Sequence, residues 1–196
     1  KPSKIVKKCK TYGADSVAIT ELHSISSSIA FYKACISENI KPILGCELNI
    51  KEGELSYSLI VLCKNKQAWE DLIGIISHSH KHSASPKDIP YIELSDFLKL
   101  SSGNFIILSG YPGSKLHDIL FTDVSRATVC KDYNECRELV RSDWREALAN
   151  EIDVYKKNFH DVYLACQLID QENQPSSLIA TKIFRHISSS VSVECV

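Results

Sequence analysis

The stretch that decides the fold is residues 18–50, AITELHSISSSIAFYKACISENIKPILGCELNI. It continues the β-branched run SVAIT at residues 16–20, which predicts a short strand. The apolar residues of segment 25–39 recur at helical spacing and predict a helix. Residues 42–50 (PILGCELNI) predict a second strand. A strand, a helix and a strand in this order indicate a parallel sheet with covering helices.

The same alternation continues on both sides of this stretch. Further strands are expected at residues 57–63, 105–108, 162–167 and 191–196. Further helices are expected at residues 4–12, 67–77, 94–100, 114–120, 176–187, and from Ser142 or Asp143 to about residue 158. Residues 78–90 are expected to form a polar loop, and residues 121–141 an insertion. Pattern alone does not separate an open sheet from a barrel, and one domain over residues 1–196 is the simplest organisation.

Composition narrows the class of protein. The 196 residues suffice for one domain with a sizeable core, and 44% of them are hydrophobic. The formal net charge is -1, so no overall basic field draws the chain to nucleic acid or to an anionic membrane. No apolar run is long enough for a membrane span, and no signal peptide is visible.

The cysteines and the ends of the sequence suggest a location and a context. The eight Cys are scattered and form no CxxC pair, which favours reduced core thiols in a cytoplasmic protein over disulfides or a zinc site. The chain has no Met and begins at Lys1. We therefore expect a fragment of a larger chain.

Three short blocks carry a family resemblance. They are FYKAC at residues 31–35, IKPI at residues 40–43 and GCE at residues 45–47. In order and spacing they resemble the PHP domain of bacterial-type (C-family) DNA polymerase III alpha subunits. Weaker similarity covers LIVLCKN at residues 59–65 and YKKNFHDVYLACQ at residues 155–167.

The resemblance implies both a fold and a chemistry. The implied fold is α/β, a distorted (β/α)7 TIM-like barrel that is incomplete at both ends of this chain. Active PHP domains hold up to three metal ions at the carboxyl ends of the strands. Those ions activate water for phosphoester hydrolysis, as in 3′–5′ exonucleases or phosphatases. The implied parent protein is a DNA-directed DNA polymerase, a nucleotidyltransferase whose catalytic aspartates lie in a later domain.

Two acidic residues occupy positions that the resemblance assigns to metal ligands. They are Glu21 and Glu47, and a hard divalent cation such as Mg²⁺ could sit on both with waters. His23 lies one residue after the family histidine position, where the family carries Gly. Glu21, Glu47 and His23 are therefore the candidate metal residues, for Mg, Mn or Zn. No catalytic or cofactor-binding residue is assigned, and no other cofactor is expected.

Three further ligand positions of the family are changed. Leu22 stands for a His, Ser58 for another His, and Tyr111 for a Cys. A trinuclear site with histidine and thiolate ligands is implausible with these residues. The simpler interpretation of Glu47 is a barrel-mouth carboxylate paired with Lys or the backbone, and that of Glu21 and His23 is a solvated loop.

Three other features could bind a metal, a phosphate or DNA, but each has a simpler interpretation. Alternating histidines at residues 78–82 (HSHKH) could capture a transition metal, whereas a mobile surface loop is the simpler reading. The turn at residues 111–114 could receive a phosphate, although a plain strand-to-helix turn is simpler. Lysines in segment 4–10 form a basic helical face. The default for such a face is solvation, although it could lie near DNA in a full polymerase.

Three hypotheses of function remain open. The first is a catalytically degenerate structural and partner-docking module of a replicative polymerase. Its partners would be the rest of the polymerase chain, a proofreading exonuclease subunit, and DNA through the full protein, with no membrane. The alternative is a metal-dependent 3′–5′ exonuclease or phosphoesterase with a reduced site. A third is a stand-alone phosphatase of the histidinol-phosphate type.

Overall fold

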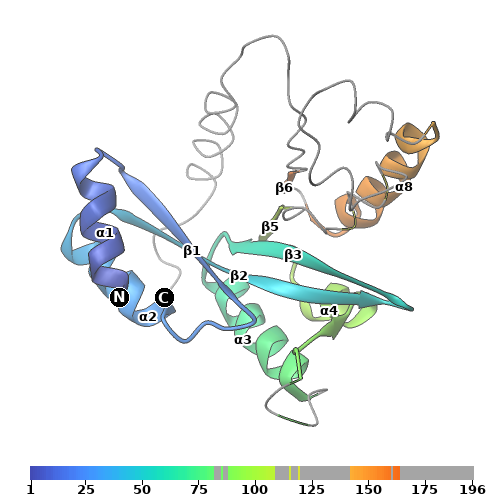
Figure 1. Cartoon of the computed structure of the whole chain (residues 1–196), viewed down its shortest axis with the longest axis horizontal. Helices are drawn as coiled ribbons and strands as arrows, with labels where there is room; N and C mark the ends of the chain where they lie inside the picture. The colour runs from blue at the N-terminus through green and yellow to red at the C-terminus, as the bar shows by residue number, and fades with distance from the viewer. Residues whose placement is uncertain are drawn as a thin grey trace.

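The computed structural model describes residues 1–81, 85, 88–108, 115, 119, 142–159 and 161–163. Within them a six-stranded sheet has the order β1-β2-β3-β5-β6, and β4 pairs with β2 (Figure 1). The strands are β1 (Ser16–Leu22), β2 (Lys41–Glu52), β3 (Leu55–Cys63), β4 (Ile92–Glu93), β5 (Phe105–Leu108) and β6 (Asp161–Tyr163). The helices are α1 (Pro2–Thr11), α2 (Ser28–Ser37), α3 (Lys66–Lys81), α4 (Leu94–Leu100) and α8 (Trp144–Lys156).

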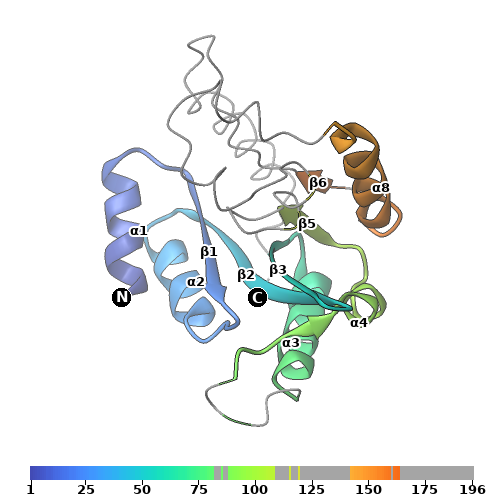
Figure 2. The same ribbon diagram turned by 45° about the vertical axis from the view of Figure 1, so that its right-hand side comes forward.

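The parallel unit expected from the quoted stretch is confirmed. β1 and β2 pair in parallel, with Ser16 opposite Lys41 and Leu22 opposite Glu47. α2 makes the crossover between β1 and β2 (Figure 2). Its Phe31 is buried in the core. The helix is shorter than segment 25–39 because the chain before Ser28 forms the turn that leads out of β1.

The expectation of a parallel sheet is wrong for the middle of the molecule. β2 pairs with β3 antiparallel, and β3 pairs with β5 antiparallel. Only Gly53 and Glu54 connect β2 to β3, and two residues can close a hairpin but not a crossover. Gly53 takes the positive φ of 61° that such a tight turn requires. The described strands therefore form a mixed sheet, and the (β/α)7 count is not seen among them.

One face of the sheet carries the main core. Alternate residues of β2, from Leu44 to Ile50, pack there with buried residues of α2, α3 and α4. The opposite face carries a small cluster of Ile43, Leu62 and Ile106, one from each of three neighbouring strands. This alternation is the period of two that a strand imposes on its side chains.

A charged cluster joins the far end of the hairpin to α8. The Lys115 ammonium lies 2.6 Å from a carboxylate oxygen of Glu52 and 2.6 Å from one of Glu151 on α8. Beneath it, the hydroxyls of Tyr57 and Tyr155 are 2.9 Å apart, and both rings are buried. Because Lys115 bridges both acids, it neutralises part of their mutual repulsion and holds α8 against the hairpin.

Several sequence expectations lie outside the described residues. They are the helix at 176–187, the final strand at 191–196, the insertion at 121–141 and the turn at 111–114, while of the helix at 114–120 only Lys115 and Ile119 are described, both as helical. The helix expected after Ser142 or Asp143 is confirmed as α8, which begins directly after Asp143. The thiols Cys35 and Cys46 are buried and free, as expected for core cysteines.

Candidate metal centre

Glu21 lies near the end of β1 and caps the following helix. Its Oε2 atom accepts a hydrogen bond of 2.8 Å from the backbone N–H of Ser27, the residue that precedes α2. A carboxylate at a helix N-terminus is favourable because it satisfies an exposed N–H and opposes the positive end of the helix dipole. Glu21 therefore has a structural role in the crossover unit.

Glu21 and Glu47 leave the sheet on opposite faces. Glu21 shares the face of Ile19, which packs on the main core, and it points toward α2. Glu47 shares the face of Ile43, in the small cluster on the other side. The strand residue opposite Glu47 is Leu22, not Glu21. The structure thus does not bring the two predicted acidic ligands together on one face.

Glu47 is held by Ser58, one of the residues that replace a metal ligand of the family. The Ser58 hydroxyl on β3 donates a hydrogen bond to Oε1 of Glu47. Leu22 beside it is 59% exposed, so an apolar side chain occupies the place on β1 nearest to the carboxylate. A carboxylate, a hydroxyl and an isobutyl group offer one good ligand for a divalent cation, and no nitrogen or sulfur ligand.

His23 is a connecting residue in a strained backbone position. Its φ is +52°, which is uncommon for a residue with a β-carbon. Its backbone N–H donates to the Glu47 carbonyl at 2.9 Å, and its own carbonyl accepts from Nε2 of His80 at 3.1 Å. Burial lowers the pKa of His23 and His80 lowers it further, while Glu47 acts in the opposite direction. At neutral pH the imidazole is therefore uncharged.

Two substitutions of His23, by Gly and by Ala, isolate the cost of its positive φ. We expect His23→Gly to be more stable than His23→Ala by about 1 kcal/mol, because both remove the imidazole but only Gly relieves the positive φ. The His80 hydrogen bond survives in both because it goes to the main chain. Urea unfolding of the two variants measures the difference. Equal stabilities would contradict the strain.

The lowered pKa of His23 also predicts a pH dependence of stability. Because its pKa is lowered in the folded chain, His23 binds a proton more tightly in the unfolded chain. The contribution of neutral His23 to the free energy of unfolding is therefore complete above pH 6.5 and declines as the pH falls below that value. Both variants should lose this decline, as measured by unfolding between pH 7.5 and 5. A wild-type decline that persists unchanged in both would assign it to another group.

The expected histidine loop is wrong at its start. α3 continues to Lys81, so His78 and His80 are helical and point in different directions. His78 lies 3.4 Å from the Asp96 carboxylate, whereas His80 reaches the His23 carbonyl. Side chains two positions apart on a helix point about 200° away from each other, so the rings of His78 and His80 lie on different sides of α3. His82 lies outside the described residues.

Cys46 lies next to Glu47 in β2 and opposite Glu21 of β1, and it is not among the candidate metal residues of the sequence. It is fully buried, and its thiol donates to the Glu21 carbonyl at 3.1 Å. Burial raises its pKa to about 12, so the group is a protonated thiol at neutral pH. Its signal in the sequence is the apolar run around it, which is typical of a core position.

The described residues do not fit a PHP metal centre. Among them, no group of three or more His, Cys, Asp or Glu side chains is placed to hold a metal ion. The two acids point to opposite faces, and each already accepts a hydrogen bond from within the chain. Tyr111, the third changed position, lies outside the described part.

The chain that contains this crossover unit belongs to a known protein family. Residues 1–167 match the PHP domain, and the chain is a member of the PHP-domain family. Its curated relatives include the DNA polymerase III subunit alpha of Chlamydia pneumoniae, 30% identical over 124 residues. That match covers 58% of this chain and 10% of the relative.

Other relatives carry the same description. The DNA polymerase III subunit alpha of Haemophilus influenzae is 27% identical over 109 residues, covering 54% of this chain and 9% of the relative. That of Staphylococcus aureus is 30% identical over 106 residues, again covering 54% and 9%. The chain thus spans about a tenth of the length of the polymerases that it matches.

A solved structure gives a more distant comparison. A protein from Bifidobacterium adolescentis, assigned as a metal-dependent phosphoesterase, aligns over 98% of this chain and 91% of its own. The TM-score is 0.47 and the identity 11%. This similarity is too low to carry an argument about function.

None of the described helices combines the length and the apolar composition that a membrane span requires.

Proposed function

We propose that this chain is the PHP module of a DNA polymerase III alpha-type replicative polymerase, and that the module is catalytically silent. The observation that carries the proposal is the divergence of Glu21 and Glu47. One carboxylate caps α2, and the other accepts the Ser58 hydroxyl on the opposite face. A hydrolytic PHP centre needs several ligands that converge on metal ions. Here the same positions stabilise the fold.

The proposal includes an architecture and partners. We propose that the whole domain, residues 1–196, closes as a distorted (β/α)7 barrel with an insertion at 121–141. The mixed sheet described here would be part of its wall. Similarity to polymerase alpha subunits supports the rest of the polymerase chain as the first partner and a cytoplasmic location. A proofreading exonuclease subunit is the second proposed partner, and it would dock on the outer helices.

Metal binding is the direct test of the proposed silence. We expect the purified chain to bind no stoichiometric Mn²⁺ or Zn²⁺ in calorimetric titration, and to leave 3′-labelled single-stranded DNA uncut in Mn²⁺. We expect Glu47→Gln to behave identically, because the Gln carbonyl oxygen can still accept the Ser58 hydroxyl.

The opposite outcome is equally well defined. Stoichiometric metal binding that Glu47→Gln abolishes, together with 3′ trimming of DNA lost in the same variant, would establish a reduced phosphoesterase site. Glu21→Gln separates the two roles of a strand-end acid. The Gln oxygen can still accept the Ser27 N–H, so only the charge at the start of α2 is lost; this variant should lower stability by up to about 1 kcal/mol and leave metal binding unchanged.

A further inference from the structure

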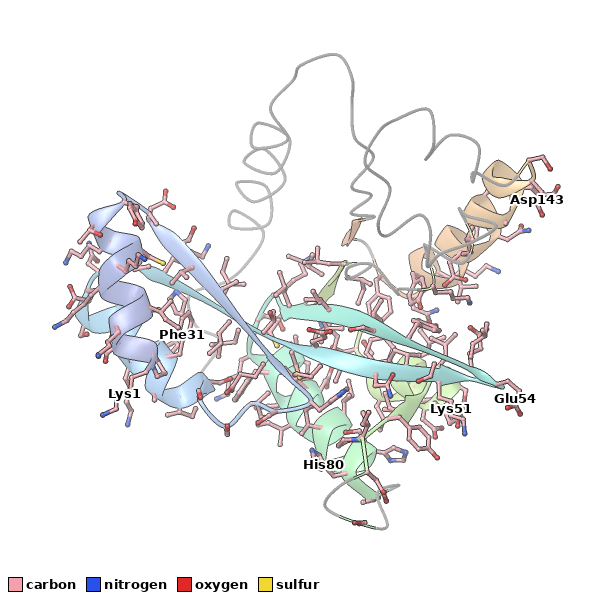
Figure 3. All side chains as sticks on the ribbon, in the orientation of Figure 1. Lys1, Phe31, Lys51, Glu54, His80 and Asp143 are labelled. Atoms are coloured by element: carbon pink, nitrogen blue, oxygen red, sulfur yellow. The ribbon has the colours of Figure 1, made fainter. Side chains whose placement is uncertain are left out.

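α1 concentrates positive charge on the outside of the molecule. It carries Lys4, Lys7, Lys8 and Lys10, it follows Lys1, and it contains no acidic residue. All five lysines are exposed. Figure 3 shows Lys1 at the start of α1, far from the tip of the β2–β3 hairpin at Glu54. The helix attaches to the core through Val6, so its lysine-bearing side faces outward.

The charge of the chain is strongly segregated. The whole chain has a formal net charge of -1, and its first ten residues hold five lysines and no acid, so the remainder carries -1 - 5 = -6. In the part that the structure describes, the ion pair of α1 joins Lys10 to Glu38 at 2.9 Å. Lys4 repels Lys7 and Lys8, which lie three and four residues away on the same helix. A polyanion bound along α1 would relieve this repulsion.

The positive residues of α1 are all lysines, and this favours a nucleic acid over an acidic protein as the polyanionic partner. Protein–protein interfaces are depleted of Lys, whereas nucleic-acid interfaces are rich in positive charge. Tyr12, at the end of α1, is 76% exposed and presents an aromatic ring beside the lysines. Rings beside basic grooves stack on unpaired bases. The surface therefore fits a nucleic acid better than an acidic protein.

We propose that the lysine face of α1 binds the phosphodiester backbone of nucleic acid without sequence preference. A helix of this length spans about 15 Å, which matches roughly four phosphates along one strand of duplex DNA. This surface deepens the proposed function and rests on it for the presence of DNA near the domain. It involves none of the residues of the candidate metal centre.

The test compares two triple variants with the same change in net charge. Lys4, Lys7 and Lys8 are replaced by Glu in the first, and the exposed Lys66, Lys81 and Lys99 of α3 and α4 in the second. Binding to a fluorescein-labelled 20-nucleotide strand and to the matching duplex is measured by anisotropy in EDTA, at several salt concentrations. Circular dichroism checks that both variants remain folded.

We expect the wild-type chain to bind with a Kd on the order of 10⁻⁵ M at low salt, weakening steeply as salt rises. The α1 variant should lose at least tenfold in affinity, and its log–log salt slope should fall by about 3. The control variant should keep most of the affinity. Tyr12→Ser should weaken binding of the single strand more than that of the duplex.

Three outcomes would overturn the proposal. They are absence of wild-type binding at low salt, equal losses in the two triple variants, and displacement of DNA by polyglutamate at equal charge concentration. The last would assign the surface to an acidic protein. Because EDTA is present, failure here leaves the metal test of the proposed function untouched, and failure of that test leaves this one untouched.

Discussion

Gly45→Ala is expected to destabilise the chain by about 3 kcal/mol or more. Gly45 lies in β2 between Thr20 of β1 and Leu62 of β3. A β-carbon there would fall far inside van der Waals contact with the carbonyl oxygen of Val61, and 2.7 Å from Cδ2 of Leu62. The first contact is with backbone, so no rotamer change relieves it. β3 would have to move away, and its hydrogen bonds to β2 would weaken.

Gly74→Ala is the matched control. Gly74 is exposed within α3, and an added β-carbon meets nothing within 4 Å. The same substitution should there raise stability by up to about 1 kcal/mol, because Ala favours a helix more than Gly does. Urea unfolding of both variants measures the effects. A Gly45→Ala variant within about 1 kcal/mol of wild type would contradict the close approach of the strands.

Gly45 and its neighbours give the GCE block a structural role that needs no metal, and the described residues contain no group placed to hold a metal ion. Gly45 allows β3 to approach, Cys46 fills the core, and Glu47 accepts the Ser58 hydroxyl. Each residue thus has a structural reason to be there. The block that carried the family resemblance reports on the packing of two strands, and hydrolytic chemistry does not follow from it.

The sequence predicted the elements well because their signals are local. The strand at 16–20, the helix within 25–39 and the strand at 42–50 are all present. The pairing direction was missed because an apolar strand looks the same in a parallel and an antiparallel ladder. The turn Gly53–Glu54 was the available signal, since two residues cannot make a crossover. The extension of α3 to Lys81 was missed because the polarity of the histidines suggested a loop.

The sequence named candidate metal residues, whose metal role stays a prediction, but it did not fix the direction of their side chains. Glu21, Glu47 and His23 were the candidate residues. Glu21 and His23 lie at the end of β1, and Glu47 lies inside β2 opposite Leu22. Whether the two acids share a face depends on the register between β1 and β2, which places Glu47 opposite Leu22. One residue of register reverses the face, and a single sequence does not fix it. The role of each acid therefore had to come from its contacts.

A second large loss is expected for Phe97→Ala, which should lower the free energy of unfolding by about 3–5 kcal/mol. Phe97 on α4 is fully buried. Its ring stacks on Phe159, after α8, at 5.6 Å and contacts Phe105 of β5 at 6.4 Å between centroids. Removing the ring takes a partner from both neighbours and leaves a cavity where α4, β5 and the end of α8 meet.

Leu100→Ala on the same helix is the control for this prediction. Leu100 is 40% exposed, so its truncation removes little buried surface and should cost less than about 1 kcal/mol. Denaturant midpoints at an unchanged slope measure both variants. If Phe97→Ala lowered the slope as well, α8 would be detaching before the sheet unfolds, since Phe159 would have lost its stacking partner. If both variants lost the same stability, the three phenylalanines would not form the joint between α8 and the sheet.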